Sequence, residues 1–263
     1  MARYLRLYKT YLKMAIKAKL SYKMDTIINI FSFLFTNGIN FLALMLMLYG
    51  VPALGNWTFE RIVFVYGLGL IPKGIDHIFT DRLWIIGMSD IVRGNLDVYL
   101  TKPVGVLFQA CAERFMFDGF GELILGAIFI ASYATSVAVE FTAAVIVPLV
   151  LCCLFATATF TAVKLFTATL AFWMKRSIAL MNFVYSFSEY TMYPLKYIGK
   201  AMTAILYFVV PFGLAVYYPA QTLYDGGNMW LALLVVAAAS SILLALAYLF
   251  WKKGLSRYES AGS

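Results

Sequence analysis

The sequence predicts an all-α protein that crosses a membrane several times. Of its 263 residues, 63% are hydrophobic and only 13% are charged, and the mean hydropathy is +0.83. A soluble domain needs a more polar surface than this composition can provide. The apolar residues also form runs of roughly 20 residues, which is the length of a helix that spans a bilayer. We therefore expect one polytopic transmembrane domain over residues 1–263, without a separate soluble catalytic domain.

The chain begins with a predicted amphipathic helix over residues 1–25. Its cations recur every three or four residues and share one helical face: Arg3, Arg6, Lys9, Lys13 and Lys17. The opposite face is rich in tyrosine: Tyr4, Tyr8, Tyr11, Ala15, Ala18 and Tyr22. This arrangement is typical of a helix that lies in the lipid head-group layer. We predict an interfacial helix whose cations contact anionic membrane lipids.

Six transmembrane helices are predicted after this helix. They cover residues 27–49, 59–79, 106–133, 141–173, 178–193 and 229–251. The segment 194–224 between the last two is also apolar, but prolines and glycines interrupt it at Pro194, Gly199, Pro211, Gly213 and Pro219. Such a run is more typical of a re-entrant hairpin, which enters the membrane and returns, than of a clean span.

The positions of lysine and arginine predict the orientation. They gather in the N-terminal helix and after the second, fourth and sixth spans, where the last group is Lys252, Lys253 and Arg257. The opposite connections, 50–58, 134–140 and 221–228, contain none. The positive-inside rule therefore places both termini in the cytoplasm, and we expect a plasma-membrane location. Lys196 and Lys200 are exceptions, because this topology puts them at the outer edge of the hairpin.

The cytoplasmic connection 81–105, named here the coupling segment, is longer than a simple reversal of direction requires. Gly94 can adopt the left-handed conformation that ends a helix, and Asn95 is a good N-cap for a second helix, which Pro103 ends. Two short helices are therefore predicted, and their residues are expected to form a docking surface rather than a purely structural loop. The candidate docking residues are Arg93, Asn95, Leu96, Asp97, Tyr99, Leu100 and Lys102.

The order of these features resembles the permease subunits of type-2 ATP-binding cassette (ABC) exporters. The resemblance rests on the N-terminal helix, on "RGNLDVYLTKP" between spans two and three, on "YPLKYIGKAMTAILYFVVP" and "YYPAQTL" between spans five and six, and on the C-terminal "RYESAG". It implies a coupling helix that docks onto a separate ATPase subunit, and re-entrant helices on the outer side. It also implies that spans one, two and five meet their counterparts in a second permease, so that the two form the pathway.

The sequence contains no phosphate-binding loop of the form G-x-x-x-x-G-K-[ST], and "GLGLIPKG" at 67–74 lacks the required ending. The chain is therefore expected to bind no cofactor and to be no enzyme, with ATP and Mg²⁺ on the partner subunit. The net charge of +8 is attributed to orientation and to lipid head groups, so nucleic acid is not expected as a partner.

Ionisable residues inside the membrane are costly and are therefore functional candidates. Arg114, Asp118 and Glu122 recur every four residues on the predicted third span. Lys164 lies near the same depth on the fourth span and is the expected partner of Asp118 or Glu122. Pairing between neighbouring helices is favoured over a direct role in transport.

Polar residues on three spans are the candidate pathway: Asn37, Asn40, Lys73, Asn182, Tyr185, Ser186 and Glu189. Such stripes either join helices or line a passage. The resemblance adds support for the passage, and both interpretations stay open. The neighbouring aromatics Phe183 and Phe187 suit an amphiphilic or lipophilic cargo such as a drug, a peptide or a lipid-like molecule. Lys73 belongs to a charged group with Asp76, His77 and Asp81, but no metal site is expected because His77 is the only histidine.

Two other functions remain as alternatives. An ion-coupled secondary transporter or channel would use the intramembrane charges to carry protons. A membrane enzyme acting on lipids would need a catalytic set that the sequence does not offer. We predict a permease that dimerises with itself or with a homologous subunit, binds two ATPase copies and exports an amphiphile by alternating access.

Overall fold

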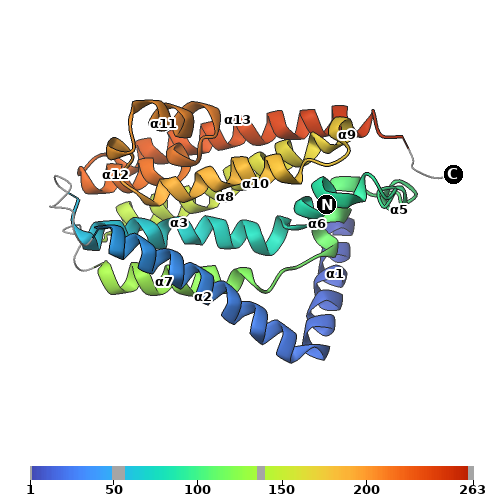
Figure 1. Cartoon of the computed structure of the whole chain (residues 1–263), viewed down its shortest axis with the longest axis horizontal. Coiled ribbons are helices and arrows are strands. Elements are labelled where there is room, and N and C mark those ends of the chain that lie inside the picture. The colour runs from blue at the N-terminus through green and yellow to red at the C-terminus, as the bar shows by residue number, and fades with distance from the viewer. Residues whose placement is uncertain (1, 49–56, 135–139, 260–263) are drawn as a thin grey trace.

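The computed structural model describes residues 2–48, 57–134 and 140–259, and their regular structure is helical, so the predicted all-α class is confirmed (Figure 1). Four helices are long and apolar enough to cross a membrane: α2 (Lys23–Leu48), α3 (Phe59–Thr80), α8 (Ala143–Thr169) with its short continuation α9 (Ala171–Met174), and α13 (Met229–Leu255). A fifth is possible if the bent pair described below is one span. The predicted number of six spans stays a prediction.

The predicted third span is not one helix. It consists of α6 (Val106–Glu113) and α7 (Gly119–Tyr133), and Arg114 between them has an extended backbone. The backbone N–H of Met116 donates to the carbonyl oxygen of Ile78 at 3.1 Å, which attaches the break to the end of α3. The sequence predicted one helix over residues 106–133, but the chain leaves the helix after Glu113 and bonds to the end of α3 instead.

Glycines allow α7 to pack closely on α3. A Cβ atom on Gly126 would lie 2.9 Å from the carbonyl oxygen of Gly67, and a Cβ atom on Gly119 would lie 2.8 Å from that of Gly74. Only a glycine fits at such distances without a shift of the backbone. α3 is therefore held against α7 on one side, while it also packs against α8.

The predicted fifth span and the segment after it are irregular. α10 (Ile178–Ser186) continues into a 3₁₀ segment, η2 (Phe187–Met192). The next elements are η3 (Leu195–Tyr197), α11 (Lys200–Ala204), η4 (Ile205–Val209), η5 (Gly213–Tyr217) and α12 (Tyr218–Tyr224). The helical pair Lys200–Val209 and Gly213–Tyr224 bends by 88° around Pro211. Such a pair is either a broken span or a re-entrant loop, so the re-entrant hairpin stays a prediction.

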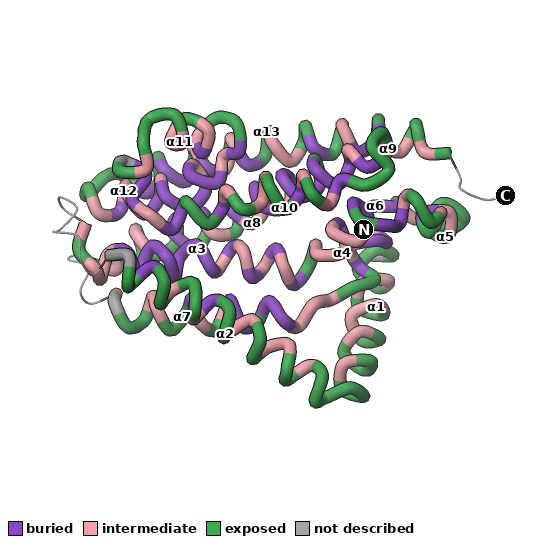
Figure 2. Tube along the Cα trace, viewed as in Figure 1, coloured by how far each residue is buried: buried purple, intermediate pink, exposed green. Residues whose placement is uncertain are grey.

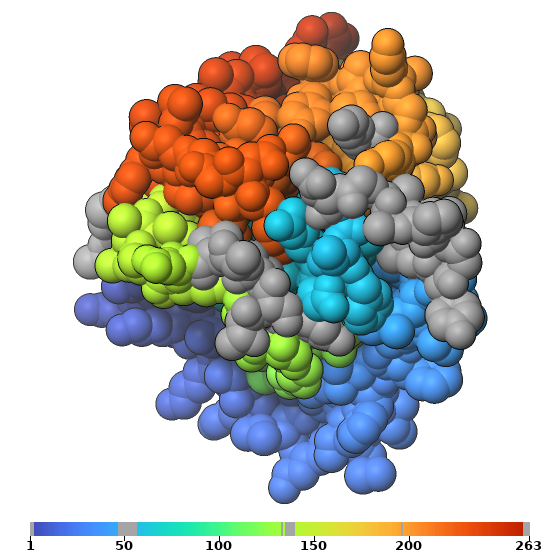
Figure 3. Space-filling view, turned by 90° about the vertical axis from the view of Figure 1, so that its left-hand side faces the viewer, coloured from blue at the N-terminus to red at the C-terminus, as the bar shows by residue number. Residues whose placement is uncertain are grey.

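α1 starts and α13 ends at the same end of the molecule as the coupling segment, which contains α4 (Arg82–Ile85), η1 (Ile86–Asp90) and α5 (Asp97–Leu100) (Figure 1). α1 (Ala2–Ser21) runs across this end at a steep angle to the long helices, and the Tyr4 ring contacts the Phe108 ring of α6 at 4.8 Å. Figure 3 shows the opposite end, where α12 and the start of α13 lie together in orange. The interfacial role of α1 stays a prediction.

Burial is greatest along α3, followed by α8, whereas α2 is exposed along most of its length (Figure 2). Large apolar side chains such as Phe31 and Phe35 of α2 point away from the rest of the chain. In a membrane protein, such a surface is covered by lipid or by another subunit.

Replacing Gly126 with valine is expected to force α7 away from α3 and to lower the free energy of unfolding by about 1–3 kcal/mol, because the added carbons meet backbone. The matched control is Gly38→Val on α2, where a Cβ atom has nothing within 4 Å. Thermal unfolding of both variants in detergent micelles measures the difference. Equal stability of the two variants would contradict the close α3–α7 packing.

Candidate functional site

Six ionisable side chains form one buried charge network: Lys73, Asp76, His77, Asp81, Glu122 and Lys164. Four of them come from α3 and from the residue that follows it, one comes from α7 and one from α8. Lys164 and Glu122 are each only 1% exposed, and Asp76 is fully buried. Charges at this depth require close partners of opposite sign.

Lys164 binds two carboxylates. Its Nζ atom lies 2.7 Å from Oδ2 of Asp76 and 2.7 Å from Oδ1 of Asp81. Asp76 also accepts hydrogen bonds from the hydroxyl groups of Thr161 and Tyr185, at 2.8 and 3.1 Å. This set of contacts joins α3, α8 and α10.

The predicted partners of Lys164, Asp118 or Glu122, were therefore wrong. α3 packs against both α7 and α8, and it supplies the carboxylates that Lys164 reaches. Glu122 also contacts α3, but it does so from α7, and its partners there are Lys73 and His77. The sequence carried the missed signal, because Asp76 and Asp81 are charged residues at the end of an apolar run.

Glu122 completes the network on the α7 side. Its carboxylate lies 3.6 Å from Nζ of Lys73 and 3.3 Å from Nδ1 of His77, and Nε2 of His77 lies 2.9 Å from Asp81. Both ring nitrogens of His77 face carboxylates, and a neutral imidazole has only one N–H donor. The geometry therefore suits the imidazolium form. In that form, three cations balance three carboxylates.

The charges of the network are paired with one another across helices. Each ring nitrogen of His77 already has a carboxylate partner. Within the described part of the chain, no three His, Cys, Asp or Glu side chains are placed to hold a metal ion. A neutral set of paired charges can join helices inside a bilayer, where a single unpaired charge would be costly.

Arg114 and Asp118 are not part of this network, and the helical face that the sequence predicted them to share with Glu122 does not form. The helix ends at Glu113 and restarts at Gly119, so Arg114, Asp118 and Glu122 do not lie on one continuous helix. Arg114 is exposed at the break. Asp118 is buried, and its Oδ1 atom has no hydrogen-bond partner among the described residues.

Three of the predicted pathway residues line one small cavity, named here the pathway cavity. Asn40 of α2, Lys73 of α3 and Glu189 of η2 surround a volume of about 110 Å³ together with Tyr66 and Tyr193. Lys73 thus belongs both to this cavity and to the charge network. The cavity wall combines these polar groups with the apolar side chains of Ala43 and Met192.

The other predicted pathway residues are placed differently. Asn37 is buried and donates from Nδ2 to the Phe33 carbonyl oxygen at 2.9 Å, and Tyr185 donates to Asp76 of the charge network. Asn182 and Ser186 are exposed, as is Glu189, so α10 and η2 present a polar face away from the rest of the chain.

The coupling segment is anchored by its own polar contacts. Arg82 pairs with Asp90 at 2.8 Å and donates to the Tyr99 hydroxyl at 3.1 Å, while that hydroxyl donates to Glu113. Burial raises the pKa of Tyr99 to about 12, and Glu113 adds to this effect, so the hydroxyl stays protonated as a donor. Gly94 has a φ of +71°, as its predicted left-handed conformation requires.

The predicted N-cap at Asn95 was wrong. Leu96 holds that position, without a side-chain cap, and Asn95 instead donates from Nδ2 to Asp90 Oδ1 at 2.9 Å. The side chain of Asn95 therefore closes the turn between the two helices rather than starting the second one. α5 begins at Asp97 and has only four residues.

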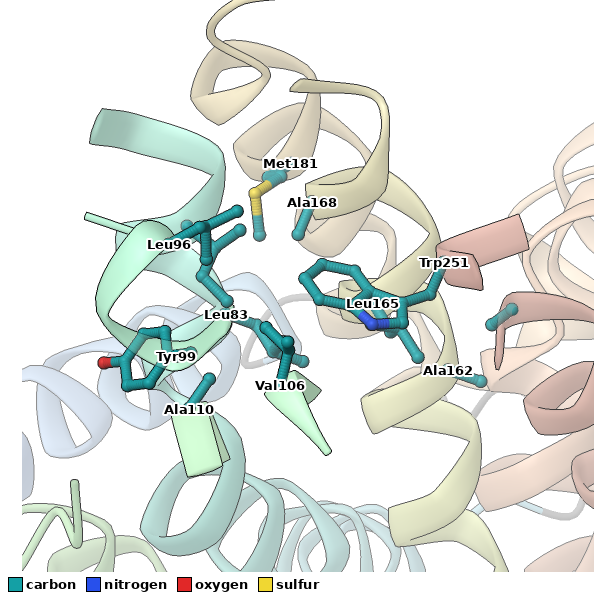
Figure 4. Packing of buried hydrophobic residues seen from close by; sticks show 12 residues of the cluster. Leu83, Leu96, Tyr99, Val106, Ala110, Ala162, Leu165, Ala168, Met181 and Trp251 are labelled. Carbon is teal, nitrogen blue, oxygen red and sulfur yellow. The ribbon is translucent and has the colours of Figure 1, made fainter. Parts of the chain in front are cut away.

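Leu96 and Tyr99 belong to the core rather than to an exposed docking surface, which corrects the prediction for these two residues. They are 0% and 5% exposed, and Figure 4 shows them packed with Leu83, Val106 and Ala110. Residues three apart share one face of a helical turn. The outward face carries Val98 and Leu100, and Arg93, Asn95 and Lys102 are exposed beside it.

The chain matches the family described as "ABC-2 family transporter protein" over residues 34–262. No curated protein matches the chain. The matched range covers α3, α7, α8 and α13 and all of the coupling segment.

Replacing Lys164 with methionine is expected to lower the free energy of unfolding by about 3–5 kcal/mol, because it leaves Asp76 and Asp81 without their cation. The exposed Lys253→Met on α13 is the control, with an expected change within about 0.5 kcal/mol. Adding Asp76→Asn to Lys164→Met should recover part of the loss, which a double-mutant cycle of thermal unfolding measures. A loss no larger than that of the control would contradict the network.

Proposed function

The chain belongs to the ABC-2 family of transporter membrane proteins, and from that premise we propose that it exports an amphiphilic or lipophilic molecule from the cytoplasm. Membership makes it the permease component of an ABC transporter, located in a membrane and working with an ATPase on a separate subunit. Our proposal adds the cargo class, the direction, the pathway and the docking site.

The observation that carries the proposal is the exposed polar face of α10 and η2. Asn182, Ser186 and Glu189 follow one another at helical spacing and are exposed in a very apolar chain. A charged carboxylate facing lipid costs roughly 2.5–3.5 kcal/mol. This face therefore favours contact with water or with a second permease, and its continuation into the pathway cavity supports a passage there.

The proposed cargo class rests on the aromatic side chains that lie beside these polar groups. Phe183 and Tyr190 are exposed on the same segment, so aromatic rings alternate with amide, hydroxyl and carboxylate groups. Binding sites for organic molecules combine apolar walls with a few polar groups that orient the ligand. A cargo with both polar and apolar parts suits such a lining better than a small ion does.

The docking site for the ATPase is assigned to the outward face of α5. Val98 and Leu100 are 57% and 49% exposed, and Arg93, Asn95 and Lys102 form a polar rim. Apolar anchors inside a polar rim are typical of protein interfaces. This surface lies at the same end as the start of α1 and the end of α13 (Figure 1), and with the lysine and arginine pattern this supports a cytoplasmic position.

Placing aspartate at both Val98 and Leu100 is expected to reduce co-purification of the ATPase by about tenfold or more, because two apolar anchors are lost. Asp97 is kept, since it interacts within the chain. The control Val92→Asp adds charge at an exposed site of the same segment outside α5. Quantitative pull-down from gentle detergent measures the effect. Full ATPase recovery with the double variant, at normal membrane insertion, would refute the docking site.

A cysteine at Ser186 is expected to react with a charged, membrane-impermeant thiol reagent about tenfold or more faster than a cysteine at Ile242. Both positions are exposed on this chain, but Ile242 lies on the apolar surface of α13. Cys111, Cys152 and Cys153 are replaced by alanine in both proteins. Equally slow labelling of both sites would contradict a water-filled passage along α10. ATP-dependent uptake of fluorescent amphiphiles into inverted vesicles tests the direction of transport.

A further inference from the structure

A larger cavity lies away from the pathway cavity, between α4, α6, α8 and α13. It has a volume of about 480 Å³, and we name it the α13 cavity. Its wall is apolar, with leucines from all four helices: Leu83, Leu107, Leu165 and Leu244. Pockets that hold organic ligands range over roughly 300–1,000 Å³, so this volume suffices for a ligand.

The α13 cavity opens toward the surface that lipid covers. Ser241, Ala245 and Tyr248 of α13 line it and are exposed. The residues beside them on this helix, Ile242 and Leu249, are each 60% exposed. A helix with such a surface faces lipid tails. The occupant with direct access is therefore a chain of a membrane lipid.

The mouth of the cavity carries a cation at its end nearest the C-terminus. Nζ of Lys252 lies 4.8 Å from the centroid of the Tyr248 ring. None of the described residues that line the cavity is acidic. Tyrosine and lysine at a helix end are typical of the level of the lipid head groups, where the lysine attracts a phosphate.

We propose that the α13 cavity binds one acyl chain of an anionic phospholipid from the cytoplasmic leaflet, with the lipid phosphate against Lys252. The apolar wall accepts the chain, Tyr248 covers it at the interface, and Lys252 selects the charge of the head group. The site is separate from the pathway and does not depend on the cargo or on the direction of transport.

The bound chain also reaches the buried charge network. Thr161 lines the α13 cavity, and its hydroxyl donates to Oδ1 of Asp76 at 2.8 Å. A lipid in the cavity therefore packs against a residue that holds Asp76 in place. Because a ligand that binds only the folded state stabilises it, anionic lipid is expected to raise the thermal stability of the protein.

The test uses the full chain in nanodiscs that contain a phosphatidylglycerol probe with a photoreactive diazirine in one acyl chain. Labelling is expected on peptides from α6 and α13. It should fall about tenfold in Lys252→Glu, because one attraction is removed and one repulsion is added. The control Lys253→Glu makes the same charge change at the next residue, which has no cation–π contact with Tyr248, and should keep most of the labelling.

A second pair of variants tests the cavity itself. Ala245→Trp fills the mouth from an exposed position, whereas Ile242→Trp adds the same ring outside the lining. Only the first is expected to reduce labelling, at unchanged size-exclusion profiles. If Ala245→Trp fails to fold, the comparison of labelling in Lys252→Glu and Lys253→Glu still tests the lipid site.

Three results would overturn the proposal. The first is equal labelling by a phosphatidylcholine probe, which would remove the role of the anionic head group. The second is an equal loss of labelling in Lys252→Glu and Lys253→Glu, which would show general electrostatic attraction instead of a specific contact at Lys252. The third is a cross-link between two copies of the chain through α13, which would show that a protein covers this surface.

Discussion

Lys164 holds α8 against α3 through two contacts of 2.7 Å, one to Asp76 and one to Asp81, inside the buried charge network. A buried amine is tolerated only beside its counter-ions, so these contacts restrict how the two helices can slide or rotate. His77 and Lys73 extend the restriction to Glu122 of α7. The position of α3 between its neighbours depends on this balance of charges.

The same network borders the other functional features. Lys73 lines the pathway cavity, and Thr161 lines the α13 cavity, while both contact carboxylates of the network. The coupling segment begins with Asp81 itself, and α4 starts at the next residue, Arg82. A displacement of that segment would therefore move Asp81, which pairs with both Lys164 and His77. This continuity gives a short covalent and ionic route between the coupling segment and the helices α3, α7 and α8.

The coupling segment shows how a very short helix can present a surface. α5 has only four residues and would not persist alone. It is held because Leu96 and Tyr99 are buried, and because Tyr99 contacts both Arg82 and Glu113. The outward residues are therefore fixed in position by the inward ones, which favours binding since little ordering remains to be done.

The sequence by itself determined the all-α class, the membrane location, the left-handed turn at Gly94 and the family resemblance, because composition, helical period and turn chemistry are local properties. Only the tertiary structure decided that Lys164 pairs with Asp76 and Asp81, that the third apolar run breaks after Glu113, and that Leu96 faces inward. Periodicity describes the faces of one helix at a time. Which faces meet depends on the rotation and the neighbours of each helix, and close glycine contacts and buried charges fix those only when the chain is folded.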